Sequence, residues 1–179
     1  LMKPLIKICG VADGDNLIKL INIEKINFLG FIFYKQSPRN ATKDFINSIS
    51  NLDFKNKRAV CVYVNADREF IEETSSYFAN PILQFHGDET NAFCKSFKKD
   101  FWKVIRVKDA ESIKLMTDYP DASGILFENY ETGIYGGTGN SFDWNLMNNI
   151  KDLDIKIILS GGINTVSYTH LTLPTIGCV

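Results

Sequence analysis

Residues 59–70 read AVCVYVNADREF. The first six residues are apolar on both faces of a strand, which is typical of a parallel sheet that is covered by helices. Asn65 then offers a helix N-cap, and a helical period runs over residues 68–78. This stretch therefore predicts a strand followed directly by a helix, which is the repeating unit of α/β folds.

The same unit recurs along the chain at intervals of about 25 residues. Strands are expected at 5–9, 28–34, 59–64, 82–86, 102–107, 124–128 and 155–160. Helices are expected at 15–23, 43–51, 68–78, 90–98, 110–118 and 144–153, with Thr42 and Asp109 as further N-caps. The pattern fits either an open doubly wound sheet or a (β/α)8 TIM barrel that is truncated after strand 7.

The composition predicts one cytoplasmic domain. The chain has 179 residues, 23% charged residues and a net charge of −1, so neither a nucleic-acid nor a membrane partner is expected. Its four cysteines have no paired spacing, which favours free thiols in a reducing compartment. No signal peptide and no apolar run of membrane-spanning length is recognisable.

Several side chains suited to chemistry lie at the expected strand ends, where parallel α/β folds gather their active sites. Cys9 ends the first strand, and Lys7 lies on the same face, where an ammonium group favours a thiolate. Arg39 follows the second strand and offers a planar fork for a carboxylate. Gln84 and His86 share one face of the fourth strand. Together with Lys7 and Arg39 they are expected to bind the substrate. Each of these residues could also be structural.

Two glycine-rich turns indicate that the ligand carries a phosphate. Backbone N–H groups at such turns approach anions closely. The chain has no nucleotide-binding glycine motif, so a bound nucleotide is not expected. The residues of these turns are Gly136, Gly137 and Gly139 in GGTG, and Ser160, Gly161 and Gly162 in SGG.

Six stretches resemble the phosphoribosylanthranilate isomerase family, which belongs to the tryptophan pathway. In chain order they read KICG, LGFIFYKQSPR, VYVN, QFHGDE, YGGTGNSFDW and LSGGIN, and they extend to Asn164. The resemblance implies a (β/α)8 barrel that needs no cofactor and no metal. It also implies an aldose–ketose isomerase that carries out an Amadori rearrangement of N-(5-phosphoribosyl)anthranilate.

The resemblance also implies roles for individual residues. Cys9 corresponds to the general base and Arg39 to the partner of the anthranilate carboxylate. Gly161 and Gly162 correspond to the phosphate-binding turn, and Asp143, in FDW, falls among the substrate-binding stretches. Where the family usually has an aspartate acid, this chain has Glu128, which we expect to be the general acid.

Two other functions remain open. The first is a related phosphoribosyl-sugar isomerase of histidine biosynthesis, although that family has an aspartate at the position of Cys9. The second is a non-catalytic α/β phosphate-binding barrel whose site has decayed. In each case the partner is a small phosphorylated molecule, and the chain could be a monomer or a homodimer.

The end of the chain departs from the pattern. Thr165, Val166, Ser167, Tyr168 and Thr169 are poor helix formers where a helix is expected. The stretch VSYTHLTLPT resembles a translated transposon-end sequencing adapter, because ten consecutive codons permit that reading. We therefore expect residues 1–165 to form an incomplete barrel and residues 166–179 to be a non-native tail.

Such a tail has consequences for the whole chain. Without native helix 7, strand 8 and helix 8, the edges of strands 1 and 7 would be unpaired. We then expect a weakly stable chain with weak or no activity, in which His170 and Cys178 have no functional meaning. The alternative is a divergent terminal strand of a native protein.

Overall fold

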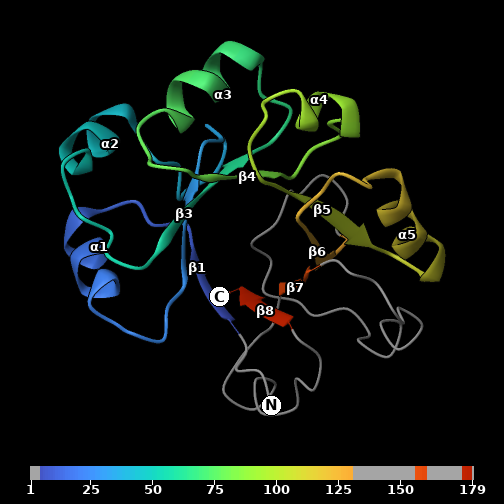
Figure 1. The fold of residues 1–179 in the computed structure, drawn as a ribbon, viewed down its shortest axis with the longest axis horizontal. Helices are drawn as coiled ribbons and strands as arrows, with labels where there is room; N and C mark the ends of the chain where they lie inside the picture. Colours follow the sequence, from blue (N-terminus) through green and yellow to red (C-terminus); the bar gives the residue numbers. More distant parts are fainter. Residues whose placement is uncertain (1–4, 131–155, 161–174, 179) are drawn as a thin grey trace.

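The computed structural model describes residues 5–130, 156–160 and 175–178, in which strands and helices alternate (Figure 1). The strands are β1 (Leu5–Cys9), β2 (Phe28–Ile32), β3 (Arg58–Tyr63), β4 (Ile82–Phe85), β5 (Phe101–Val107), β6 (Gly124–Asn129), β7 (Lys156–Ser160) and β8 (Thr175–Cys178). The helices are α1 (Gly14–Ile21), α2 (Lys43–Ile49), α3 (Arg68–Ser75), α4 (Asn91–Lys95) and α5 (Ala110–Lys114), and the 3-10 helix η1 (Leu115–Asp118) continues α5. The helix expected at 144–153 lies outside the described residues.

The strands form a closed barrel. They are all parallel and pair in chain order, and β1 pairs with both β2 and β8. Helices α1 to α5 lie outside the ring of strands (Figure 1). This arrangement confirms the (β/α)8 barrel and excludes the open doubly wound sheet.

The closure of the barrel differs from the expectation of two unpaired edges. Ile176 of β8 pairs with Ile158 of β7 on one side and with Leu5 of β1 on the other. Strand ladders join backbone groups, so a short run rich in β-branched residues can occupy this place whatever its origin. The pairing covers both edges, as a native terminal strand would, and it does not identify the source of the tail.

The helices begin where the sequence provides a cap. The Thr42 hydroxyl accepts the Phe45 N–H, and the Asp109 carboxylate accepts the Ser112 N–H, as expected. The prediction of Asn65 as the cap of α3 was wrong, because the cap is Asp67. Asn65 instead has a φ of 49° and lies in the loop before the helix. Helices α3 and α4 also end earlier than expected.

The barrel has two apolar cores, because side chains alternate between the faces of each strand. One core fills the space between the barrel and its helices and includes Leu29, Phe31 and Cys61. The other fills the barrel itself. Its buried members are Phe28, Val60, Val62, Ile82, Trp102, Val104, Leu126 and Ile158. The inner face of each strand continues, at every second residue, toward the carboxyl end of the barrel.

Candidate active site

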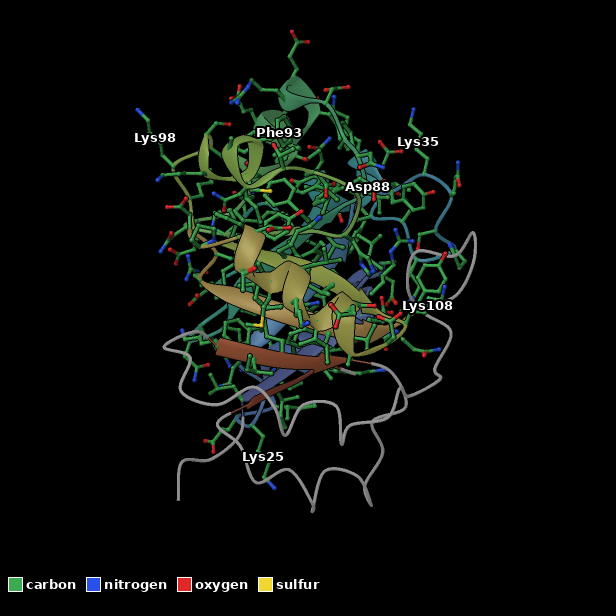
Figure 2. The ribbon with its side chains drawn as sticks, turned by 90° about the vertical axis from the view of Figure 1, so that its right-hand side faces the viewer. Lys25, Lys35, Asp88, Phe93, Lys98 and Lys108 are labelled. Atoms are coloured by element: carbon green, nitrogen blue, oxygen red, sulfur yellow. The ribbon has the colours of Figure 1, made fainter. Side chains whose placement is uncertain are left out.

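The carboxyl ends of the strands open onto one end of the barrel, which we call the mouth. Lys35, Asp88 and Lys108 follow β2, β4 and β5 and lie along one side of Figure 2, whereas Lys98, which precedes β5, lies on the opposite side. In (β/α)8 enzymes the chemistry takes place at the carboxyl end. On the inner face the mouth is formed by Cys9, Ile32, His86, Arg106, Glu128 and Ser160.

Lys7 and Cys9 lie together on the inner face of β1, as their spacing predicted. Lys7 is fully buried, whereas Cys9 is partly exposed. Gly30 pairs with Cys9 across the ladder and makes room for both side chains. A Cβ atom on Gly30 would lie 3.0 Å from the Cys9 Sγ and 3.1 Å from the Lys7 Cε. The Lys7 side chain and the Cys9 thiol therefore both pack over Gly30 on the inner face of the barrel.

Arg39 is docked against the end of β1. Its Nη1 donates a hydrogen bond to the Cys9 carbonyl oxygen at 2.9 Å. The guanidinium lies on Gly10, where a Cβ would come within 2.7 to 2.9 Å of three Arg39 side-chain atoms. Gly10 also has a φ of 83°, which favours glycine. Gly10 therefore allows the fork of Arg39 to lie against the backbone at the end of β1.

Glu128 and His86 form a buried pair in the mouth. The His86 Nε2 lies 2.7 Å from the Glu128 Oε2, and both side chains are less than 10% exposed. The second carboxylate oxygen, Oε1, lies 3.5 Å from the Ser160 hydroxyl, which is the outer limit of a hydrogen bond. The structure thus brings together three residues that lie up to 74 positions apart in the sequence.

Gln84 lies deeper on the same face of β4 as His86, which confirms the predicted alternation. The side chain is 2% exposed, and its Oε1 has no hydrogen-bond donor among the described residues. Buried amide oxygens normally have such a donor. Gln84 therefore places a buried amide oxygen without a described donor below His86 on the inner face of the barrel.

The sequence interpretation missed Arg106. Arg106 pairs with Glu128 across the β5–β6 ladder and continues the inner face of Trp102 and Val104. Its guanidinium lies 3.6 Å from Asp88 and over the ring of Tyr130 at 5.6 Å. The same two-residue alternation places Arg106 on the inner face, once the structure shows that Trp102 and Val104 of β5 face the interior of the barrel.

The stretches VYVN and QFHGDE interlock behind His86. The Asn65 N–H donates to the Glu89 Oε1, and its side-chain oxygen accepts the Asp88 N–H, both at 2.7 Å. The Lys103 ammonium donates to the Gly87 carbonyl oxygen at 2.6 Å and to the Glu89 Oε2 at 3.0 Å. The Lys103 and Glu89 side chains are each 3% exposed. These motif residues hold the loop that follows His86.

Two other cysteines differ from Cys9. Cys61 and Cys94 are fully buried in the outer core, between barrel and helices. Burial raises the pKa of each thiol to about 12. Neither is suited to be a base at neutral pH, which leaves Cys9 as the candidate among these three.

Several expected site residues lie outside the described part of the chain. These are Gly136, Gly137, Gly139 and Asp143, together with Gly161 and Gly162 of the second turn. Within the described residues, no group of three or more His, Cys, Asp or Glu side chains could hold a metal ion. Within the same ranges, no helix is long and apolar enough to span a bilayer.

The sequence of this chain is similar to that of one known enzyme family over nearly its whole length. The family model for N-(5'-phosphoribosyl)anthranilate (PRA) isomerase matches residues 6–175. The chain belongs to the PRA isomerase family. A PRA isomerase from Nitrosomonas europaea is 35% identical over 178 residues, which cover 96% of this chain and 83% of the relative. One from Pseudomonas fluorescens is 36% identical over 158 residues, which cover 88% of this chain and 76% of the relative.

Solved structures of PRA isomerases share the fold. The crystal structure of the Thermotoga maritima enzyme has a TM-score of 0.82 and 24% identity, and the alignment covers 98% of this chain and 87% of that one. A PRA isomerase in complex with reduced 1-(o-carboxyphenylamino)-1-deoxyribulose 5-phosphate has a TM-score of 0.80, with 98% and 86% coverage. These likenesses independently support the barrel.

Proposed function

We propose that this chain isomerises N-(5'-phosphoribosyl)anthranilate to 1-(2-carboxyphenylamino)-1-deoxyribulose 5-phosphate, a step of tryptophan biosynthesis. One observation carries the proposal. In a chain of the PRA isomerase family, a partly exposed thiol and a buried carboxyl group reach the inner face of the barrel mouth. An acid and a base at one site are the groups that an Amadori rearrangement needs.

The first step is assigned to Glu128 as the general acid. Its carboxyl group donates a proton to the furanose ring oxygen, and the bond between that oxygen and carbon 1 breaks. The bonding electrons pass to the oxygen, while the nitrogen lone pair forms the C=N bond of a Schiff base. Burial beside His86 supports this role, because a carboxyl group at a fixed place can deliver a proton in one direction.

The second step is assigned to Cys9 as the general base. Its thiolate removes the proton from carbon 2, the C–H electrons form a C=C bond with carbon 1, and the C=N electrons return to nitrogen. The resulting enolamine becomes the ketone by moving a proton from the carbon 2 hydroxyl to carbon 1. Lys7 supports the thiolate, since both side chains pack over Gly30.

The substrate is anionic at both ends, and its binding groups are assigned accordingly. Arg39 pairs with the anthranilate carboxylate, because its fork lies beside the strand that carries Cys9. Gln84 accepts a hydrogen bond at the floor of the site. The phosphate is assigned to Ser160 and the turn at Gly161 and Gly162, with the GGTG loop and Asp143 as further binding residues.

The cellular setting follows from the same proposal. The partner is a small phosphorylated molecule, and the free thiols Cys9, Cys61 and Cys94 suit the cytoplasm. One solved relative is described as monomers that were generated from a dimeric PRA isomerase. We therefore keep both the monomer and the homodimer as candidate states of this chain.

We also propose that residues 166–179 are not the native continuation of this gene. Amplifying the source DNA across codons 160–180, with library preparation that uses no transposon, tests this directly. A different continuation supports the proposal, and the same VSYTHLTLPT sequence overturns it.

Substitution of Glu128 tests the mechanism. Glu128→Gln removes the donated proton while keeping the side-chain shape, so we expect turnover to fall by about 1,000-fold. Turnover is measured as the loss of substrate fluorescence, and circular dichroism reports the fold. Glu111→Gln, on the exposed face of α5, is the matched control and should keep the wild-type rate. Near-normal turnover by Glu128→Gln would remove this residue from the mechanism.

A further inference from the structure

We propose that His86 is a positioning residue: its imidazole holds the Glu128 carboxyl group in the place from which that group delivers its proton. The inference rests on the proposed function, in which Glu128 is the acid. It differs from the expectation that His86 binds the substrate, because the described partner of the imidazole is Glu128 itself.

The two oxygens of Glu128 have different surroundings. Oε2 lies 2.7 Å from the His86 Nε2, well within hydrogen-bond distance. Oε1 lies 3.5 Å from the Ser160 hydroxyl, a contact too long to hold it strongly. Ser160 ends β7, beside the turn proposed for the phosphate. The short contact with His86 therefore fixes the Glu128 carboxyl group beside that turn.

The backbone on both sides of His86 is also fixed. The His86 N–H donates to the Tyr63 carbonyl oxygen at 2.8 Å, which ties the residue to β3. The next carbonyl, that of Gly87, accepts from the buried Lys103 ammonium. A Cβ on Gly87 would overlap the Asn65 side chain, so this loop allows little adjustment. An imidazole on such a base can hold a flexible carboxyl group in one place.

The same hydrogen bond stabilises the negative charge that develops on Glu128 in the acid step. In the proposed arrangement the His86 Nε2–H donates to the Glu128 Oε2. When the O–H bond of the carboxyl group breaks and the proton joins the ring oxygen, Glu128 becomes a carboxylate. The hydrogen bond from Nε2 then becomes charge-assisted and stronger. His86 therefore favours the state that follows proton transfer.

Kinetics separate positioning from substrate binding. His86→Leu should lower kcat by about 10- to 100-fold, because the acid is misplaced, while KM changes by less than about threefold. His86→Gln supplies an amide N–H near the place of Nε2 and should recover kcat to within about fivefold of wild type. A rise in KM with unchanged kcat in His86→Leu would overturn the proposal in favour of substrate binding.

A double-mutant cycle tests whether the effect passes through Glu128. Glu128→Asp shortens the side chain and withdraws the carboxyl group from His86. Adding His86→Leu to Glu128→Asp should then cost less than about threefold, far less than in the wild type. Equal losses in the two backgrounds would show that His86 acts only on the fold and would contradict the proposal.

A measurement without turnover keeps the two proposals apart. The chain has two histidines, His86 and His170. In the His170→Gln variant the remaining ring ¹⁵N signals therefore belong to His86. We expect the proton on Nε2 and a clear change of that signal in Glu128→Leu but not in Glu111→Gln. An unchanged signal would overturn the pairing. Absence of wild-type turnover, with the signal change present, would instead count against the proposed isomerase function alone.

Discussion

At the scale of single residues, three thiols of one chain differ in their surroundings. Cys61 and Cys94 lie in the outer core, where burial raises each pKa to about 12. Cys9 is partly exposed on the inner face, beside the buried Lys7. Because the thiolate is the reactive form, this contrast is expected to appear directly as chemical reactivity.

Alkylation of the folded protein at pH 8 should therefore select Cys9. A thiol with a pKa of about 12 has about 0.01% thiolate at this pH, so Cys61 and Cys94 should react at least about 100-fold more slowly. Iodoacetamide labelling followed by peptide mass spectrometry measures each site. Cys9→Ser provides the matched control, and equally rapid labelling of Cys61 would contradict the burial.

The sequence predicted which residues share a face but not which residues meet. The two-residue spacing placed Lys7 with Cys9 and Gln84 with His86, because alternation in a strand is local. The contact of His86 with Glu128 joins residues 42 positions apart, so it depends on how β4 and β6 curve around the barrel. Arg106 was missed for the same reason, since its face becomes known only once the barrel is closed.

At the scale of elements, the caps were predicted where side chain and loop agree. Thr42 and Asp109 immediately precede their helices and bond to them. Asn65 has the right chemistry, but its side chain binds the Asp88 N–H of the neighbouring loop, and Asp67 caps α3 instead. Tertiary contacts of this kind cannot be seen in a local pattern.

The cap at Asp109 predicts a pH dependence of stability. The Ser112 hydroxyl and N–H hold the pKa of Asp109 below its ordinary value. A lowered folded-state pKa gives stability that is present above the unfolded value, near 3.9, and is lost as pH falls through the folded value. We therefore expect the melting temperature of wild type, relative to Asp109→Asn, to be constant above about pH 5 and to decline below about pH 4.

Thermal melts at pH 7, 5 and 3 check this expectation. Asp118→Asn, in η1, provides the comparison, because Asp118 caps no helix among those described. A difference between wild type and Asp109→Asn that stays the same at pH 3 would contradict the account of this cap.

At the scale of the whole molecule, the buried ion pair between Lys103 and Glu89 joins one strand to two loops. The side chains of Lys103 and Glu89 are each 3% exposed. Through Gly87 and Asn65 they join β5 to the loops after β4 and β3. Removing one partner of such a pair leaves a buried charge without compensation. This network supports the wall of the mouth that carries His86.

Lys103→Met should consequently lower the free energy of unfolding by about 3 kcal/mol. Lys114→Met removes one partner of an exposed pair with Glu111 and should cost less than about 1 kcal/mol. Urea denaturation of both variants gives the comparison. An equal loss of unfolding free energy in the two variants would show that the buried pair stabilises the protein no more than the exposed pair does.

The alternation of strands and helices predicted the order of the elements from residue 5 to residue 130, and the family resemblance implied that they form a barrel. The closing strand was not predicted, because Thr175–Cys178 carries none of the helix–strand pattern that marks the other seven. Its place is defined by the gap between β7 and β1, which only the curved sheet creates. Closure removes the unpaired edges that favoured a weak or inactive chain, so we expect a measurable rate.

The most direct test of the central claim is to incubate the wild-type chain with N-(5'-phosphoribosyl)anthranilate and follow the fluorescence of the substrate. The account predicts a loss of fluorescence that depends on protein concentration and is abolished in both Cys9→Ser and Glu128→Gln. A wild-type rate no greater than that of buffer would contradict the claim that this chain is a PRA isomerase.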